Sequence, residues 1–123
     1  MKPLLALFAA LVLAFAPTRS AHATSTLQFD GEGYSVDLEI GDDERPVIST
    51  VRIGQPGDKD YRPVPRQQVR VKEFDTQRKR LELHYTATDQ APGIPSFTLV
   101  MTATEATLTL EGRRIVSKAS WEM

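Results

Sequence analysis

Apolar and polar residues alternate with a period of two along most of the chain, and residues 69–86 give the clearest example. Apolar side chains stand at every second position on both sides of a polar connection that opens at Asp75. An aspartate side chain can accept a hydrogen bond from the backbone two residues further on and so stabilise a tight turn. The pattern therefore predicts a β-hairpin with one apolar face.

The same alternation predicts six further short strands. They are residues 26–30, 34–40, 47–53, 97–102, 107–110 and 115–121. Glycine and proline stand between them, and threonine and valine within them, which disfavours amphipathic helix. We expect an all-β fold, a small antiparallel meander of about eight strands that forms either a barrel or a two-layer sandwich.

Several residues depart from the simple alternation. Apolar residues fall on predicted outward faces at four positions: Ile48, Phe74, Val100 and Val116. A bulge at Lys72 or Glu73 would bring Phe74 inward and turn Glu73 outward, because one extra residue exchanges the faces of a strand. The other three predict an exposed apolar patch suited to self-association as a homodimer. Scattered single apolar residues, which are ordinary on protein surfaces, are the alternative.

The first 23 residues have the character of a secretory signal peptide. Lys2 precedes an apolar run, and Ala21-His22-Ala23 supplies a cleavage site with small residues at the required spacing. An uncleaved anchor is the alternative, but the run is shorter than the ~20 residues that a spanning helix needs. We expect a periplasmic or secreted protein without a stable membrane anchor, in which residues 24–123 form a single all-β domain.

Charge is unevenly distributed along the predicted mature chain. Lys2 and Arg19 fall in the leader, so thirteen basic residues face sixteen acidic ones and the net charge is near −3. Basic residues concentrate in one segment: Arg62, Arg66, Arg70, Lys72, Arg78, Lys79 and Arg80. The negative net charge and the expected export argue against nucleic-acid binding. Such arginines are better suited to bind an anionic glycan, a lipid head group or an acidic protein surface.

Residue types that commonly perform catalysis are scarce. The chain has no cysteine, and His84 is the one histidine outside the leader. Glu82 shares its strand face and could form an acid/base pair with it, but any polar strand face places two residues in this way. No motif for a nucleophile, a metal or a phosphate is present. We therefore expect no enzymatic activity, no catalytic residues, no cofactor and no metal.

The longest irregular segment, residues 55–66, contains three prolines and is expected to cross between strands. Long connections are also where binding residues tend to lie. We therefore predict a non-catalytic binding module that engages another protein, as an inhibitor, immunity or accessory factor does. A small β-barrel carrier of an apolar or anionic ligand is the alternative. The predicted contact residues are Tyr61, Arg62, Arg66, Arg70 and Phe74.

Overall fold

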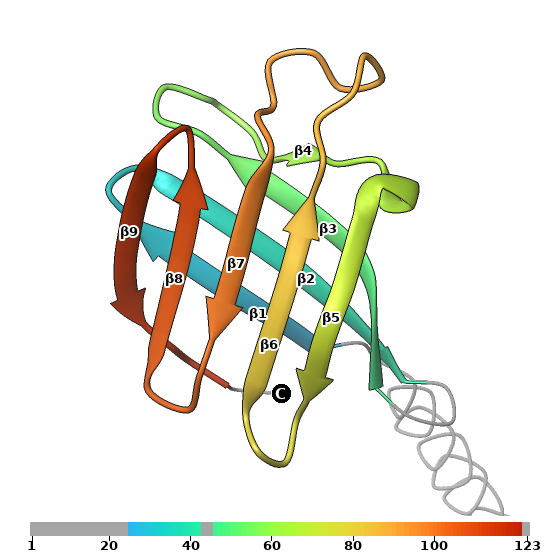
Figure 1. Cartoon of the computed structure of the whole chain (residues 1–123), viewed down its shortest axis with the longest axis vertical. Helices are drawn as coiled ribbons and strands as arrows, with labels where there is room; N and C mark the ends of the chain where they lie inside the picture. Colours follow the sequence, from blue (N-terminus) through green and yellow to red (C-terminus); the bar gives the residue numbers. More distant parts are fainter. Residues whose placement is uncertain (1–24, 43–45, 122–123) are drawn as a thin grey trace, which may run out of the picture.

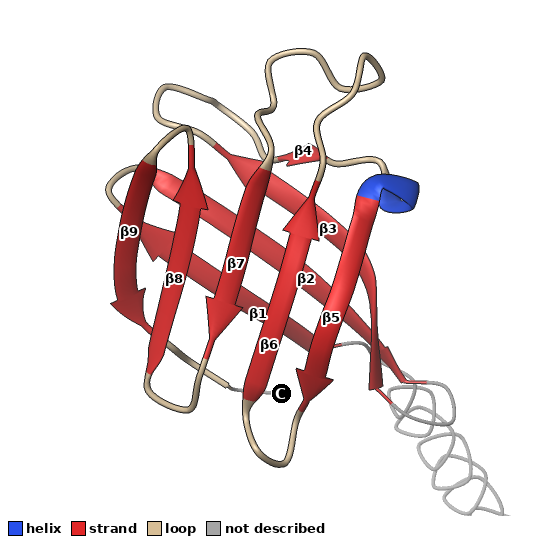
Figure 2. Ribbon diagram, viewed as in Figure 1, coloured by secondary structure: helices blue, strands red, loops and turns tan. Residues whose placement is uncertain are grey.

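The structure, a computed structural model, describes residues 25–42 and 46–121, which form two antiparallel β-sheets stacked face to face. The two sets of strands cross obliquely (Figure 1), and the only helical element among the described residues is a single short turn (Figure 2). The all-β prediction is confirmed. Of the two predicted architectures, the structure has the two-layer sandwich rather than the closed barrel.

Strand order in both sheets follows the chain. The four-stranded sheet contains β1 (Ser25–Gly31), β2 (Tyr34–Asp42), β3 (Pro46–Gly54) and the short β4 (Arg62–Pro63). The five-stranded sheet contains β5 (Val69–Asp75), β6 (Arg80–Tyr85), β7 (Phe97–Met101), β8 (Glu105–Leu110) and β9 (Arg113–Lys118). The predicted crossover carries the chain from one sheet to the other through the 3₁₀ turn η2 (Arg66–Gln68).

The predicted signal peptide, residues 1–23, lies outside the described residues. Within the part of the chain that the structure covers, no helix has the length and apolar character needed to cross a bilayer.

The inward faces of the two sheets form one apolar cluster. Its largest fully buried side chains include Phe29, Leu38, Ile53, Leu83 and Tyr85. At about 25 cal/mol for each Å² of apolar surface removed from water, this burial is the main favourable term in folding. The Tyr85 ring lies 5.4 Å from that of Phe97 at a tilted angle, and its hydroxyl has no hydrogen-bond partner among the described residues.

The predicted bulge in the β5–β6 hairpin is present at Lys72. Val71 pairs with Leu83 and Glu73 pairs with Glu82, so Lys72 is the extra residue in β5. Phe74 consequently lies on the inward side, where it packs against the core.

A second bulge, at Ser49, corrects the prediction for β3. Thr50 pairs with Glu39 and Ile48 pairs with Ile40, which leaves Ser49 unpaired, and its hydroxyl donates to the carbonyl of Glu39 at 3.1 Å. The bulge exchanges the faces of the first part of the strand. Ile48, expected outside, is 5 % exposed, whereas Val47, expected inside, is 41 % exposed.

The end of the chain also differs from the prediction. β9 ends at Lys118 rather than at Trp121, and β8 begins at Glu105 rather than at residue 107. The Trp121 indole donates to the carbonyl of Thr102 at 2.8 Å, so Trp121 lies against the β7–β8 turn instead of continuing a strand. Val100 and Val116 face outward as predicted, but Ile48 is buried and is not part of the predicted exposed patch.

One lateral side of the sandwich, where β1 meets β9, is closed by polar contacts. The Arg113 guanidinium donates to Glu32 at 2.9 Å and lies 5.6 Å from the ring centre of Tyr34. The Ser117 hydroxyl donates to the carbonyl of Asp30 at 2.8 Å. A Cβ at Gly31 would stand 3.0 Å from Ile115, so glycine permits this close approach.

The bulge at Ser49 makes a mutational prediction about two adjacent residues. Ile48→Ala should lower the free energy of unfolding by about 2–4 kcal/mol because it leaves a cavity in the core. Val47→Ala should change it by less than about 0.5 kcal/mol, since that side chain is largely in solvent. Urea denaturation of the two variants measures both values. If Val47→Ala destabilised the protein more than Ile48→Ala, Val47 would be the buried residue, as simple alternation predicts, and there would be no bulge at Ser49.

Candidate functional site

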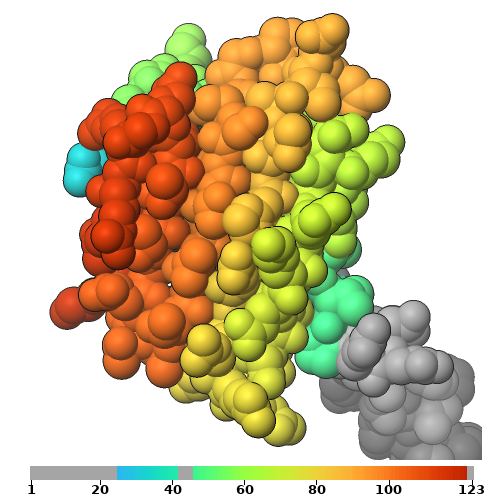
Figure 3. Space-filling model, in the orientation of Figure 1, coloured from blue at the N-terminus to red at the C-terminus, as the bar shows by residue number. Residues whose placement is uncertain are grey.

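The opposite lateral side of the sandwich, between β3 and β5, contains a groove. β4 pairs with Arg52 and Ile53 only, so the first residues of β3 have no neighbouring strand on that side. In Figure 3 the blue-green start of β3 adjoins the yellow-green atoms of β5. The groove has a volume of about 300 Å³ and is lined by Pro46, Val47, Ile48, Arg66, Val71 and Phe74.

Arg66 spans the upper end of this groove. Its guanidinium donates to the carbonyl of Val69 at 3.1 Å and to the carbonyl of Ile48 at 3.3 Å. One planar side chain therefore connects the first residue of β5 with the part of β3 that has no neighbouring strand on this side, and Arg66 also lines the groove.

The contacts of Arg66 predict a contribution to stability. Arg66→Ala should lower the free energy of unfolding by about 1 kcal/mol and accelerate amide exchange along the start of β3 and β5, since both carbonyls lose a donor. Arg114→Ala, an exposed arginine on β9, is the matched control and should have little effect. Equal effects of the two substitutions on exchange and stability would show that Arg66 does not join the sheets.

The predicted contact residues lie in different parts of the molecule. Arg66 and Phe74 line the same groove, whereas Arg70 faces away from the core on the outer face of β5. Arg62 donates to the carbonyl of Pro92 at 2.8 Å and so holds the 86–96 loop. The Tyr61 ring lies against Gly54 at the end of β3. The structure brings Arg66 and Phe74 together and leaves the other three separate.

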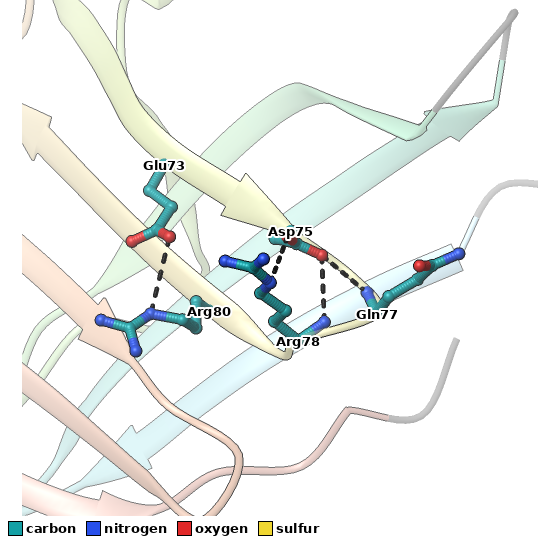
Figure 4. Close-up of polar contacts among 5 residues, drawn as sticks. All are labelled: Glu73, Asp75, Gln77, Arg78 and Arg80. Carbon is teal, nitrogen blue, oxygen red and sulfur yellow. Dashed lines mark hydrogen bonds and ion pairs between the residues drawn. The ribbon is translucent and has the colours of Figure 1, made fainter.

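At the tip of the β5–β6 hairpin, Arg78 lies 3.8 Å from Asp75 and Arg80 lies beside Glu73 (Figure 4). The Asp75 carboxylate accepts hydrogen bonds from the backbone of Gln77 and Arg78, both at 3.0 Å, which confirms the predicted turn. Glu73 and Arg80 form an ion pair at 3.5 Å. These exposed contacts orient the tip and contribute little to stability.

His84 lies on the outer face of the five-stranded sheet, near the end of β6 and opposite Arg70 of β5. Its Nε2 lies 2.8 Å from a Glu82 carboxylate oxygen and its Nδ1 lies 3.3 Å from the Thr98 hydroxyl. These partners fit an imidazole that donates from Nε2 and accepts at Nδ1. The hydrogen bond from His84 holds the pKa of Glu82 below its ordinary value, with a smaller contribution from the charge of Lys72.

This His84–Glu82 pair has no third acid/base or metal-ligating partner. The described residues contain no group of three or more histidine, cysteine, aspartate or glutamate side chains that could hold a metal ion. The pair lies on the outer face of the sheet, with the Thr98 hydroxyl as the second partner of the imidazole.

The outer face of the five-stranded sheet also contains a polar hollow of about 540 Å³ beside β5. It is lined by Gln67, Gln68, Val69, Arg70, Lys72, His84 and Thr86. Sequence reasoning placed Arg70 in a binding site but not its neighbours. The signal was present in the hairpin register, because a bulge at Lys72 sets Arg70 opposite His84.

The lowered pKa of Glu82 depends on His84. In His84→Ala the pKa of Glu82 should rise toward its ordinary value, because the charged carboxylate loses its hydrogen-bond donor. The interaction stabilises the fold above the ordinary pKa and is lost as the pH falls through the lowered one. An NMR titration of the Glu82 carboxyl carbon measures the shift. Thr98→Val serves as control and should leave the pKa lowered; an unchanged pKa in His84→Ala would refute the assignment.

Comparison of the chain with protein-family models, with curated proteins and with solved structures gives no match. The fold and surface define the chain as a two-layer antiparallel β-sandwich with one open lateral groove. Its function must be argued from that surface.

Proposed function

We propose that the protein is a non-catalytic exported binding module and that it engages another protein through the groove between β3 and β5. The observation that carries the proposal is that five of the six residues lining this groove are apolar and that one of them, Val47, is exposed. Grooves of this kind accept a large apolar side chain of a partner and exclude water around it.

Charge next to the groove defines the chemistry of the partner. Arg66 lies at one end of the groove, and the β5–β6 hairpin carries Arg78, Lys79 and Arg80, of which Arg78 and Arg80 pair with Asp75 and Glu73. An acidic protein surface that presents an apolar side chain would match both features, and electrostatic complementarity would speed the encounter. Of the five predicted contact residues, Arg66 and Phe74 line this groove. Tyr61, Arg62 and Arg70 lie outside it, and their role in binding stays a prediction.

The bulges indicate how the partner is held. Ser49 interrupts β3 and Lys72 interrupts β5, one on each side of the groove. An irregular edge is a poor template for an added strand, and edge bulges are a common protection against strand pairing. We therefore expect contact through side chains in the groove rather than through an added β-strand.

The carrier function has less support. The inward side chains of both sheets fill the space between them, as the fully buried Phe29, Leu38, Leu83 and Leu108 illustrate. A ligand inside the sandwich would have to displace such side chains, which pack at the density of an organic crystal.

Site-specific photocrosslinking tests the protein-binding function. A photoreactive residue at Val47 should capture a distinct protein in cells that export the chain, whereas the same residue at Val116, which is 51 % exposed on β9, should not. With that protein purified, Val47→Asp should weaken binding about tenfold or more, because it removes an apolar contact and repels an acidic surface. Val116→Asp is the matched control.

Two results would overturn the proposal. One is equal affinity of the Val47→Asp and Val116→Asp variants for the captured protein. The other is capture of a second copy of this chain alone, which would make the groove a homodimer interface.

A further inference from the structure

We propose that the polar hollow beside β5 is a binding site for a tetrahedral oxyanion, such as a phosphate or sulfate group. The hollow lies on the outer face of the five-stranded sheet, whereas the groove of the proposed function lies at the lateral side. The inference does not rest on the proposed function.

The lining of the hollow supplies hydrogen-bond donors and positive charge. Arg70 and Lys72 contribute the guanidinium and ammonium groups, Gln67 and Gln68 contribute amides, and Thr86 contributes a hydroxyl. No carboxylate is among the lining residues. Donors from several directions suit a group with three or four acceptor oxygens, and an arginine can bind two of them side by side.

The two cations are not engaged elsewhere in the described part of the chain. The ion pairs there involve Arg52, Arg78, Arg80, His84 and Arg113, and neither Arg70 nor Lys72 has a carboxylate oxygen within 4.0 Å. Among the described residues, no ion pair therefore competes with a ligand for either cation.

Local structure holds the donors on one side of the sheet. Arg70 pairs directly with His84, and the bulge at Lys72 places an additional cation on the exposed side of β5. The backbone N–H of Thr86 donates to the carbonyl of Gln68 at 3.1 Å, which joins the end of β6 to the turn η2. This bond fixes the backbone of Gln68 and Thr86 next to the strand that carries the cations.

His84 lines the hollow, and the Glu82 carboxylate that it contacts affects the charge that an anion would meet there. Glu82 accepts the Nε2 hydrogen bond of His84 and is close enough to Lys72 for that cation to contribute to its lowered pKa. The Glu82 carboxylate therefore reduces the attraction of the hollow for an anion. Removal of this charge should strengthen anion binding, an effect opposite to that of general damage to the fold.

Titration with inorganic phosphate at constant ionic strength tests the site. The protein is produced from the full-length chain, and binding is followed by its NMR signals. The side-chain signals of Gln67, Gln68 and Arg70 should shift saturably with phosphate and with sulfate but not with chloride. Arg70→Ala should weaken binding about tenfold, since a hydrogen bond to a charged group is lost. Glu82→Gln should strengthen it.

The matched control is Arg114→Ala. Thr98 and Thr109 continue the row of cross-strand partners from Arg70 and His84 to Arg114, which is thus exposed on the same face, roughly 19 Å away across four strand spacings. It should bind phosphate like the unaltered protein. Absence of a saturable shift would overturn the proposal. Equal weakening by Arg70→Ala and Arg114→Ala would also overturn it, because the effect would then be general attraction of an anion to positive charge.

Vesicles distinguish two sources of the oxyanion. Sedimentation with phosphatidylcholine vesicles that contain phosphatidic acid, lost in Arg70→Ala but not in Arg114→Ala, would support a lipid phosphate as the ligand. Saturable binding of inorganic phosphate without sedimentation would support a soluble phosphorylated or sulfated ligand.

Discussion

The arrangement of this sandwich depends on one constraint, the insertion of one extra residue into each of the two strands that border its open side. An inserted residue exchanges the faces of a strand, so it decides which side chains enter the core and which remain outside. In β3 the insertion of Ser49 buries Ile48 and exposes Val47. In β5 the insertion of Lys72 brings Phe74 inward and adds a cation to the outer face.

The two lateral sides of the molecule consequently differ. On one side, Arg113 and Ser117 of β9 contact the β1–β2 region, and Gly31 lets the strands approach closely. On the other side, the bulged strands diverge from regular pairing, and Arg66 bridges them at one end of the groove. A surface that is closed on one side and open on the other has a natural place for recognition, because the open side leaves apolar side chains in contact with water.

β5 contributes to both candidate surfaces. Successive residues of a strand point to opposite sides of its sheet, and the bulge at Lys72 brings Phe74 to the same side as Val71. Val71 and Phe74 therefore face the groove, while Arg70 and Lys72 face the polar hollow. A protein partner in the groove and an oxyanion in the hollow would therefore contact the same strand from two sides. The core beneath β6 and β7 keeps this strand in place, since Leu83 and Leu99 are fully buried.

The sequence by itself determined the fold class, because the period of two and the turn residues are local properties. It predicted the hairpin, the Asp75 turn and a bulge at Lys72 or Glu73, because Glu73 and Phe74 break the alternation together, and the structure has this bulge at Lys72. It did not predict the bulge at Ser49, because Val47 and Ile48 are both apolar and either can face the core.

Only the tertiary structure decided between sandwich and barrel, and only it showed which charged residues are neighbours. Arg62 and Arg66 are close in sequence, yet one binds the carbonyl of Pro92 and the other the carbonyls of Ile48 and Val69. The physical reason is that strand pairing and sheet stacking join residues distant in the chain, and the burial that drives them depends on the whole core rather than on any one segment.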